Sequence, residues 1–208
     1  MYNENEYEQF KTMLQNNCGT ELYHKLSGSC AGIAGLGGLG SNVAVSLARS
    51  GVGRLVICDF DVVEMSNINR QQYRLCDIGR PKTDALESIL KSISPVVRIE
   101  KHQIRAGADN IRDIFAGCDV ICECFDRPSA KQEIVETVLT KLEVPIIAAS
   151  GLAGYGRSND IITRQINERF FLVGDMESGI DKVSGLYAAR VAIAANHQAN
   201  KVLELLLK

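Results

Sequence analysis

A glycine-rich turn near the N-terminal end restricts the possible folds of this chain more than any other feature. The turn is Gly35-Leu36-Gly37-Gly38-Leu39-Gly40. It follows the apolar run 30–34 and precedes residues 43–48, whose apolar positions repeat with a helical period. Glycines at this spacing allow a tight turn, and the N–H groups that begin a helix bind phosphate. A turn chosen only for helix–strand packing is the alternative.

The chain alternates strands and helices up to about residue 150. Strands are predicted at 54–59, 96–99, 118–125 and 144–149, and helices are predicted to begin at Pro81 and Pro128. Parallel strands need crossover connections, and the crossover helices cover both faces of the sheet. The pattern therefore predicts an α/β, Rossmann-like, doubly wound and mostly parallel sheet.

The pattern changes at both ends of the chain. Residues 4–14 predict a helix, residues 151–156 a glycine-rich loop, residues 161–166 and 169–173 a hairpin, and residues 186–207 a long terminal helix. A chain of 208 residues suits one compact domain with small additions. We expect a helical arm over residues 1–29 and a nucleotide-binding domain over residues 30–208.

Composition and charge exclude several function classes. The chain is 46% hydrophobic and 23% charged, which suits a globular protein. Its formal net charge of −2 provides no positive electrostatic potential that would attract nucleic acid or an anionic membrane. Residues 1–6 are polar and acidic, unlike a secretory signal, and no apolar run approaches membrane-spanning length. The seven cysteines, an odd number, favour a reduced compartment. We expect a cytoplasmic protein without nucleic-acid or membrane partners.

Charged residues at and after the end of the second predicted strand support nucleotide binding next to the glycine turn. Asp59 ends that strand, where a carboxylate accepts hydrogen bonds from ribose hydroxyls. Displacement on a triphosphate needs cations on the leaving oxygens, and Arg70, Arg74 and Lys82 follow in the connection. The alternatives are a turn residue for Asp59 and a solvated basic loop for the connection.

Asp126 directly follows the fourth predicted strand. Its carboxylate therefore belongs to the carboxyl edge of the sheet, where the glycine turn also opens. Magnesium usually takes one or two protein carboxylates and completes its shell with phosphate oxygens and water. Asp126 is the candidate magnesium ligand, and it also suits a cap for the helix that begins at Pro128.

At these residues the chain resembles the ThiF/MoeB superfamily of adenylating enzymes, and most of all its short ThiF-type members of thiamine biosynthesis. The matching blocks are Gly35-x-Gly37-Gly38-Leu39-Gly40, Asp59-Phe60-Asp61-x-Val63-x-x-Ser66-Asn67-x-Asn69-Arg70-Gln71, Gly79-x-Pro81-Lys82 and Asp126. The resemblance implies that ATP is bound by Gly35, Gly37, Gly38, Gly40, Asp59, Asn67, Arg70, Gln71 and Lys82. It further implies that Arg70, Lys82 and Asp126 serve catalysis, with Asp126 placing Mg²⁺.

The reaction that the resemblance implies is an adenylation. The C-terminal carboxylate of a ThiS-like, Gly-Gly-tailed sulfur carrier protein would attack the α-phosphate of ATP, which gives an acyl-adenylate and pyrophosphate. The family is typically homodimeric. An NAD-dependent oxidoreductase is an alternative, although His24, His102 and His197 lie in no recognisable catalytic setting. A non-catalytic nucleotide-binding scaffold is a second alternative.

The chain departs from the larger family members in three respects. It lacks their two zinc-binding CxxC pairs, so no zinc is expected, and Cys122-Glu123-Cys124 suits core thiols on one face of a strand. It has no cysteine after Cys124 to take over an activated carrier. Relatives also insert an N-terminal arginine from the partner subunit, whereas this sequence offers Lys11 or Lys25 in that region.

Overall fold

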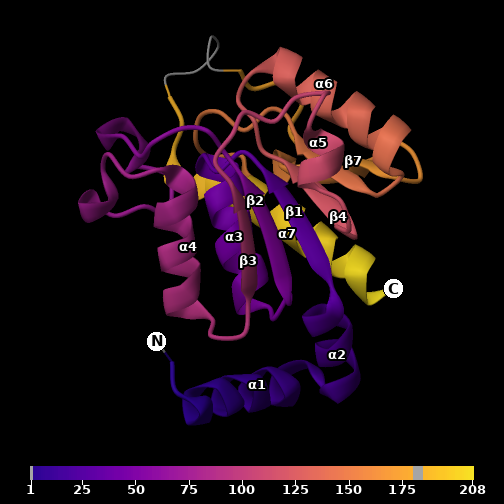
Figure 1. Ribbon diagram of the computed structural model, residues 1–208. Helices are drawn as coiled ribbons and strands as arrows, with labels where there is room; N and C mark the ends of the chain where they lie inside the picture. The colour runs from indigo at the N-terminus through magenta and orange to yellow at the C-terminus, as the bar shows by residue number, and fades with distance from the viewer. Residues whose placement is uncertain (1, 180–184) are drawn as a thin grey trace.

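The computed structural model describes residues 2–179 and 185–208, and a seven-stranded sheet forms its centre (Figure 1). The strand order is β3-β2-β1-β4-β5-β7-β6, and paired strands are parallel except for β6 and β7. The strands are β1 Cys30–Ala34, β2 Arg54–Cys58, β3 Arg98–His102, β4 Val120–Glu123, β5 Ile146–Ala149, β6 Ile162–Gln165 and β7 Phe170–Gly174. The expected Rossmann-like sheet with a C-terminal hairpin is confirmed.

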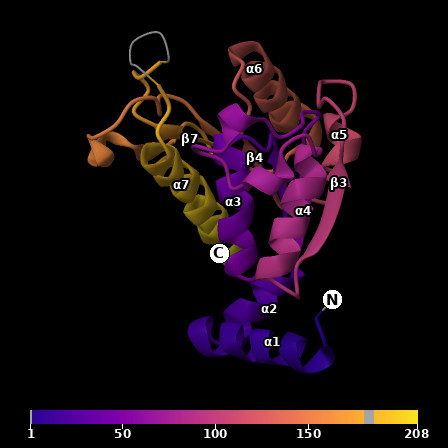
Figure 2. The ribbon, with the colours of Figure 1, turned by 90° about the vertical axis from the view of Figure 1, so that its left-hand side faces the viewer.

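Helices cover both faces of this sheet (Figure 1, Figure 2). They are α1 Glu4–Cys18, α2 Thr20–Gly28, α3 Gly38–Arg49, α4 Lys82–Ile93, α5 Ile111–Ile114, α6 Pro128–Thr137, which continues into the π-helical turn η3 Val138–Leu142, and α7 Ala188–Leu207. One apolar cluster joins the sheet to α3, α4 and α7, and a second joins it to α5 and α6. Short 3₁₀ turns lie at η1 Met65–Asn67, η2 Leu75–Asp77 and η4 Ser158–Asp160.

Burial follows the position of each strand in the sheet. Every residue of β1, β4 and β5 is buried, because helices cover both faces of these central strands. The third strand was predicted at 96–99, but β3 spans Arg98–His102 and most of it is exposed. Since β3 lies at the edge of the sheet, it carries charged residues and lacks the apolar run that indicates a buried strand.

The N-terminal arm consists of two helices at the amino edge of the sheet, opposite the glycine turn (Figure 1). Gly19 separates them with a φ of 85°, which favours glycine. Leu14 of α1 packs against Gly51, and the carbonyl of Leu26 in α2 accepts a hydrogen bond from Gly53 N at 2.9 Å. The second helix was not predicted.

Helix α7 packs against α3 and against the sheet. The small residues Ala194, Ala195 and Ala199 are buried there, whereas Ala188 and Ala189 are exposed. The small residues in the middle of α7 therefore pack in the core, whereas those of its first turn do not. Among residues 2–179 and 185–208, no helix has both the length and the apolar character needed to cross a membrane.

Candidate functional site

The glycine turn forms a close-packed cradle between β1 and α3. A Cβ on Gly40 would overlap the carbonyl oxygen of Gly35, so this position admits no larger residue without movement of the backbone. Gly35 has a φ of 91°, and a Cβ there would lie 2.9 Å from the carbonyl oxygen of Cys124. The cradle therefore packs closely against the end of β4, which is paired with β1 in the sheet.

The N-terminus of α3 opens into this cradle. Gly37 occupies the cap position, and no side chain in the described ranges caps the helix. A Cβ on Gly37 would have Gln71 Nε2, at 3.9 Å, as its nearest neighbour, so there is space above the turn. The first backbone N–H groups of a helix have no partner within the helix, and they carry partial positive charge. The arrangement suits a phosphate group.

Asp59 ties the end of β2 to the cradle. Its buried carboxylate accepts hydrogen bonds from Leu36 N at 2.6 Å and from Asp61 N at 2.8 Å. The Tyr73 hydroxyl donates to the carbonyl of Leu36 at 2.8 Å from the connecting segment. Each carboxylate oxygen can accept a second hydrogen bond, which leaves Asp59 able to meet a sugar hydroxyl as well as to hold the turn.

Residues 67–71 lie over the cradle. Asn67 is buried in η1, where its side-chain oxygen accepts from Glu64 N at 3.1 Å and its carbonyl accepts from Arg70 N and Gln71 N. The aliphatic part of Arg70 lies beside Gly38, 3.6 Å from the site of a Cβ there. Asn42 of α3 holds the segment in place, since its Nδ2 donates to the carbonyl of Arg70 at 3.3 Å.

The amide of Gln71 contains an acceptor that the protein does not use. Gln71 Oε1 is buried and has no hydrogen-bond partner within the described part of the chain. A buried acceptor without a partner costs free energy, about 1–3 kcal/mol in typical cases. Because the other amide atom lies nearest to Gly37, a ligand in the cradle that carries a hydrogen-bond donor would satisfy Oε1.

Lys82 is buried at the start of α4, and its ammonium pairs with Asp61 Oδ2 at 2.9 Å. Pro81 occupies the cap position of α4, so Lys82 is the first helical residue rather than the second. Lys82 N also donates to the carbonyl of Asp61 at 3.0 Å. Through Asp61 and Asp59, Lys82 is connected to the glycine turn.

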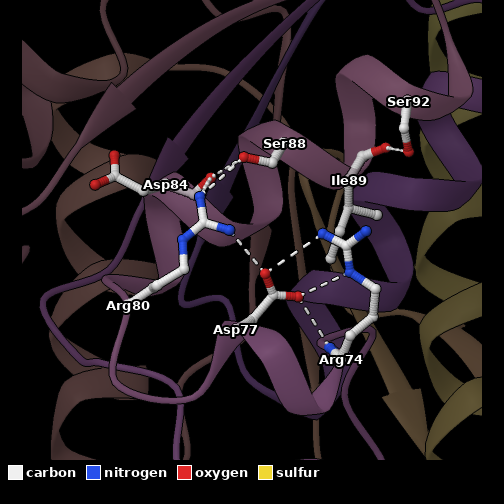
Figure 3. A network of polar contacts seen from close by, with 7 residues as sticks. All are labelled: Arg74, Asp77, Arg80, Asp84, Ser88, Ile89 and Ser92. Carbon is white, nitrogen blue, oxygen red and sulfur yellow. Dashed lines mark hydrogen bonds and ion pairs between the residues drawn. The ribbon is translucent and has the colours of Figure 1, made fainter.

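Arg74 does not join this group, contrary to the expectation that it supplies a cation for phosphate. Its Nε donates to Asp77 Oδ2 at 3.0 Å, and Arg80 binds the other oxygen of the same carboxylate at 2.8 Å (Figure 3). Asp77 is wholly buried. Burial opposes its ionisation, but the hydrogen bonds from Arg74 and Arg80 lower the pKa of this carboxyl. Arg74 therefore stabilises the connection.

Asp126 is exposed just beyond the end of β4. It follows Phe125, whose ring lies 3.0 Å from the site of a Cβ on Gly35. The side chain of Asp126 makes no hydrogen bond with residues 2–179 or 185–208, and Arg127, not Asp126, takes the cap position of α6. The same residues contain no group of three His, Cys, Asp or Glu side chains that could hold a metal. A single free carboxylate fits Mg²⁺ whose other ligands are phosphate oxygens and water.

Sequence reasoning missed a buried ion pair next to Asp126. Glu123 of β4 is wholly buried and binds Lys131 of α6, with Oε2 and Nζ 2.9 Å apart. Burial raises the pKa of Glu123, and Lys131 counteracts the shift. Glu123 Oε1 also accepts from Phe125 N at 2.6 Å, so the pair shapes the turn that carries Asp126. In the sequence, this pair is indicated by an acidic residue inside an otherwise apolar strand.

The two cysteines beside Glu123 are core thiols, as expected. Cys122 of β4 and Cys124, just beyond the end of the strand, are buried in the same apolar cluster, which places both side chains on one face of the sheet. Burial raises the pKa of both thiols. Neither thiol is therefore ready to act as a nucleophile.

A polar hollow of about 440 Å³ opens beside Asp126. Residues from the β3–α5 connection and from the first turns of α6 line it, among them Arg105, Asp109, Arg127, Ser129 and Glu133. The guanidinium of Arg105 lies over the Phe60 ring at 5.2 Å, just after Asp59. Lys11 and Lys25, by contrast, lie on the arm at the opposite edge of the sheet (Figure 1).

These residues fit ATP in three physical respects. The cradle supplies uncapped N–H groups for phosphate, Gln71 supplies an unused acceptor, and Lys82 supplies a buried cation. Asp126 supplies a carboxylate suited to Mg²⁺. All of them belong to connections at the carboxyl edge of the sheet, where ligands bind in folds of this kind.

Several known proteins are related to this chain in sequence. Residues 10–208 match the ThiF family model. The chain is 34% identical over 154 residues to the sulfur carrier protein ThiS adenylyltransferase of Escherichia coli (strain K12), over 74% of this chain and 61% of that protein. It is 30% identical over 156 residues to the adenylyltransferase and sulfurtransferase uba4 of Pyricularia oryzae, over 74% of this chain and 32% of that protein. The chain thus spans less than two thirds of these relatives.

The fold is similar to solved structures. E. coli tRNA N6-threonylcarbamoyladenosine dehydratase, solved in complex with ATP, superposes with a TM-score of 0.86 at 18% identity, over 99% of this chain and 97% of that one. E. coli MccB with AMPCPP and MccA superposes with a TM-score of 0.71 at 21% identity, over 89% and 58%. At such identities the likeness establishes the fold alone. The match over residues 10–208 leads to one conclusion: the chain belongs to the ThiF family.

Proposed function

We propose that this protein is an ATP-dependent adenylyltransferase that activates the C-terminal glycine carboxylate of a ThiS-like sulfur carrier protein. The uncapped N-terminus of α3 above the glycine turn, covered by Arg70 and Gln71, is the observation that carries the proposal. The activities of the relatives, a ThiS adenylyltransferase and an adenylyltransferase and sulfurtransferase, support it.

In this proposal the nucleotide lies along the carboxyl edge of the sheet. Asp59 binds the ribose, and the backbone of Gly35, Gly37, Gly38 and Gly40 binds phosphate. Asn67 and Gln71 contact the nucleotide, and Arg70 and Lys82 contact its phosphates. Mg²⁺, bound through Asp126, would neutralise charge on the phosphate oxygens. No zinc is included, because the sequence lacks the CxxC pairs.

The proposed reaction is a displacement at phosphorus. A carboxylate oxygen of the carrier attacks the α-phosphorus, the bond from that phosphorus to the bridging oxygen breaks, and pyrophosphate leaves with the bonding electrons. Arg70 and Lys82 stabilise the charge that accumulates on the leaving oxygens. Because both side chains are held by backbone or carboxylate contacts, little reorganisation is needed as the charge develops.

The proposal also covers the setting of the reaction. We place the protein in thiamine biosynthesis in the cytoplasm, and we propose a homodimer. In a homodimer, Lys11 or Lys25 of one arm could approach the site of the other copy, although an ammonium does not reproduce a bidentate guanidinium contact.

Exchange of labelled pyrophosphate into ATP tests the reaction. With Mg²⁺ and a Gly-Gly-tailed carrier, the wild-type protein should catalyse exchange, and exchange should require the carrier. Asp126→Asn should reduce the rate at least about a hundredfold, as expected when transition-state charge loses a stabilising group. Asp113→Asn, an exposed acid on α5, is the matched control and should retain the wild-type rate.

Two results would each remove this function, and a third would remove Asp126 as its magnesium ligand. Absence of exchange with ATP bound would favour a non-catalytic scaffold. Tight binding of NAD with weak binding of ATP would favour an oxidoreductase. Full exchange by Asp126→Asn would show that the proposed magnesium site lies elsewhere.

A further inference from the structure

Two exposed tyrosines from distant parts of the chain lie together near the cradle. Tyr155 is 76% exposed and Tyr187 is 44% exposed. Their ring centroids are 5.5 Å apart with an interplanar angle of 74°, an edge-to-face arrangement. Paired aromatic rings in water contribute little to a core, and aromatic side chains with one polar end are enriched at binding surfaces.

The backbone holds this pair in place. Gly154 bridges to Leu186, and Gly154 N donates to the carbonyl of Gly185 at 3.0 Å. Arg190, which is only 4% exposed, donates to the carbonyl of Gly156 at 2.6 Å and to Asp175 at 2.6 Å. A buried guanidinium with these partners fixes the turn that carries Tyr155 to helix α7. The rings are therefore positioned before any ligand arrives.

The pair is continuous with the proposed ATP site. Tyr187 takes the cap position of α7, and one turn later Val191 packs 3.0 Å from the site of a Cβ on Gly38. The carbonyl of Leu186 accepts a hydrogen bond from Asn69 Nδ2 at 3.5 Å, and Asn69 precedes Arg70. The tyrosines thus stand beside the segment of Asn69 and Arg70, which contacts the phosphates in the proposed function.

We infer that Tyr155 and Tyr187 form the surface against which the carrier's C-terminal tail lies, and that they select a thin, glycine-ended tail. The inference rests on the proposed function. A Gly-Gly segment has no side chains, so its backbone can lie flat against an aromatic ring. Such contact would also order a flexible tail and direct its carboxylate toward the cradle.

The test compares alanine and phenylalanine variants in the exchange assay. Tyr155→Ala and Tyr187→Ala should each raise the KM for the carrier about tenfold, the loss typical of truncating an interface aromatic, while the KM for ATP stays unchanged. Tyr155→Phe and Tyr187→Phe should retain the wild-type KM for the carrier, because the ring remains. Tyr7→Ala is the control, since Tyr7 is 41% exposed on α1 at the opposite edge of the sheet.

Direct binding of the carrier, measured by calorimetry without ATP, separates the two proposals. If wild type shows no exchange but binds the carrier, and the alanine variants bind it about tenfold more weakly, the adenylation proposal fails and the tyrosine surface stands. If wild type exchanges and the alanine variants keep its KM and its affinity, the tyrosine surface alone is overturned. An equal rise in the KM for ATP, or no binding of the carrier by wild type, also overturns it.

Discussion

At the scale of single residues, the cradle depends on atoms that leave no room for a side chain. Gly40 faces the carbonyl of Gly35, and Gly35 faces the carbonyl of Cys124. These backbone atoms, just beyond the first and fourth strands, cannot easily move aside, because Gly35 N donates to the carbonyl of Cys58 and Cys124 N donates to the carbonyl of Ala34, each at 2.8 Å. The glycines are thus required by the packing of the turn as well as by any phosphate.

Gly40→Ala should lower the free energy of unfolding by at least about 1–3 kcal/mol, the usual cost of inserting atoms into a packed region. The urea midpoint at constant m-value measures this change. Gly28→Ala is the control, because a Cβ there would meet no atom within 4 Å, and it should change stability by less than about 0.5 kcal/mol. Equal midpoints for the two variants would contradict the geometry of the turn.

Asp175 gives a prediction for acid conditions. Burial opposes its ionisation, but hydrogen bonds from Ser178, Glu177 and Arg190 lower its pKa from 3.8 to about 2. A carboxyl group whose pKa is lowered in the folded state stabilises the protein at pH values above its unfolded pKa. This stabilisation is lost as the pH falls through the folded pKa. The difference in unfolding free energy between wild type and Asp175→Asn should be constant above pH ~4 and should shrink between pH ~4 and ~2. A difference that stays constant to pH ~2 would contradict the prediction.

The residues of the site differ in how readily the sequence reveals them. The glycine turn and Asp59 are found from local spacing, since a strand end and a helix start suffice to locate them. Glu123 and Lys131 could not be paired in this way, because their contact depends on which face of α6 packs on β4. The engagement of Arg74 by Asp77 was hidden for the same reason: a basic residue in a loop shows no sign of its partner.

At the scale of elements, the connection between β2 and α4 is an ordered structure. In each of the two 3₁₀ turns the last side chain accepts a hydrogen bond from the residue before the turn: Asn67 Oδ1 from Glu64 N at 3.1 Å in η1, and Asp77 Oδ2 from Arg74 N at 3.0 Å in η2. Val62 bridges to Pro81, which brings the two ends of the connection together. Its order comes from side-chain contacts that have no periodic signature in the sequence.

Asp77→Asn should destabilise the protein by about 1–3 kcal/mol, because a wholly buried carboxylate loses charged hydrogen bonds to Arg74 and Arg80 (Figure 3). Glu204→Gln is the control, since the Glu204 side chain, which pairs with Lys201 and Lys208, is 47% exposed, and ion pairs of exposed carboxylates are worth about 0–1 kcal/mol. Chemical denaturation of both variants at pH ~7 provides the comparison, and a larger loss for Glu204→Gln would refute the ranking.

The types of the elements could be predicted from the sequence, but their positions in the sheet could be predicted less well. Helices α4 and α6 begin beside Pro81 and Pro128 as expected, since proline favours the first turn. The hairpin of β6 and β7 was also predicted, but not that β7 extends the sheet by pairing in parallel with β5. That pairing depends on a connection of 20 residues, 150–169, which local patterns do not describe.

At the scale of the whole molecule, α7 contacts parts of the chain that are far apart in the sequence. Gln198 donates to the carbonyls of Glu123 in β4 and Ile147 in β5, at 3.0 and 2.9 Å. The helix also packs on α3. The sheet, the cradle and the tyrosine pair therefore share one support.

Ala195→Leu should destabilise the fold by about 1–3 kcal/mol, because Ala195 is 1% exposed and the larger side chain would push α7 away from the core. The same substitution at the exposed Ala188, on the same helix, is the control and should change stability by less than about 0.5 kcal/mol. Thermal unfolding followed by circular dichroism measures both. If the two variants melt alike, α7 does not pack as described.

The packing of Val191 against Gly38 has a consequence for the order of events during synthesis. All seven strands leave the ribosome before α7, so the sheet can pair while the cradle still lacks this neighbour. A nascent chain would then hold a glycine turn without its lateral support. Capture of a nucleotide would become favourable only once α7 has docked, and ligand binding would mark the completion of folding rather than guide its first steps.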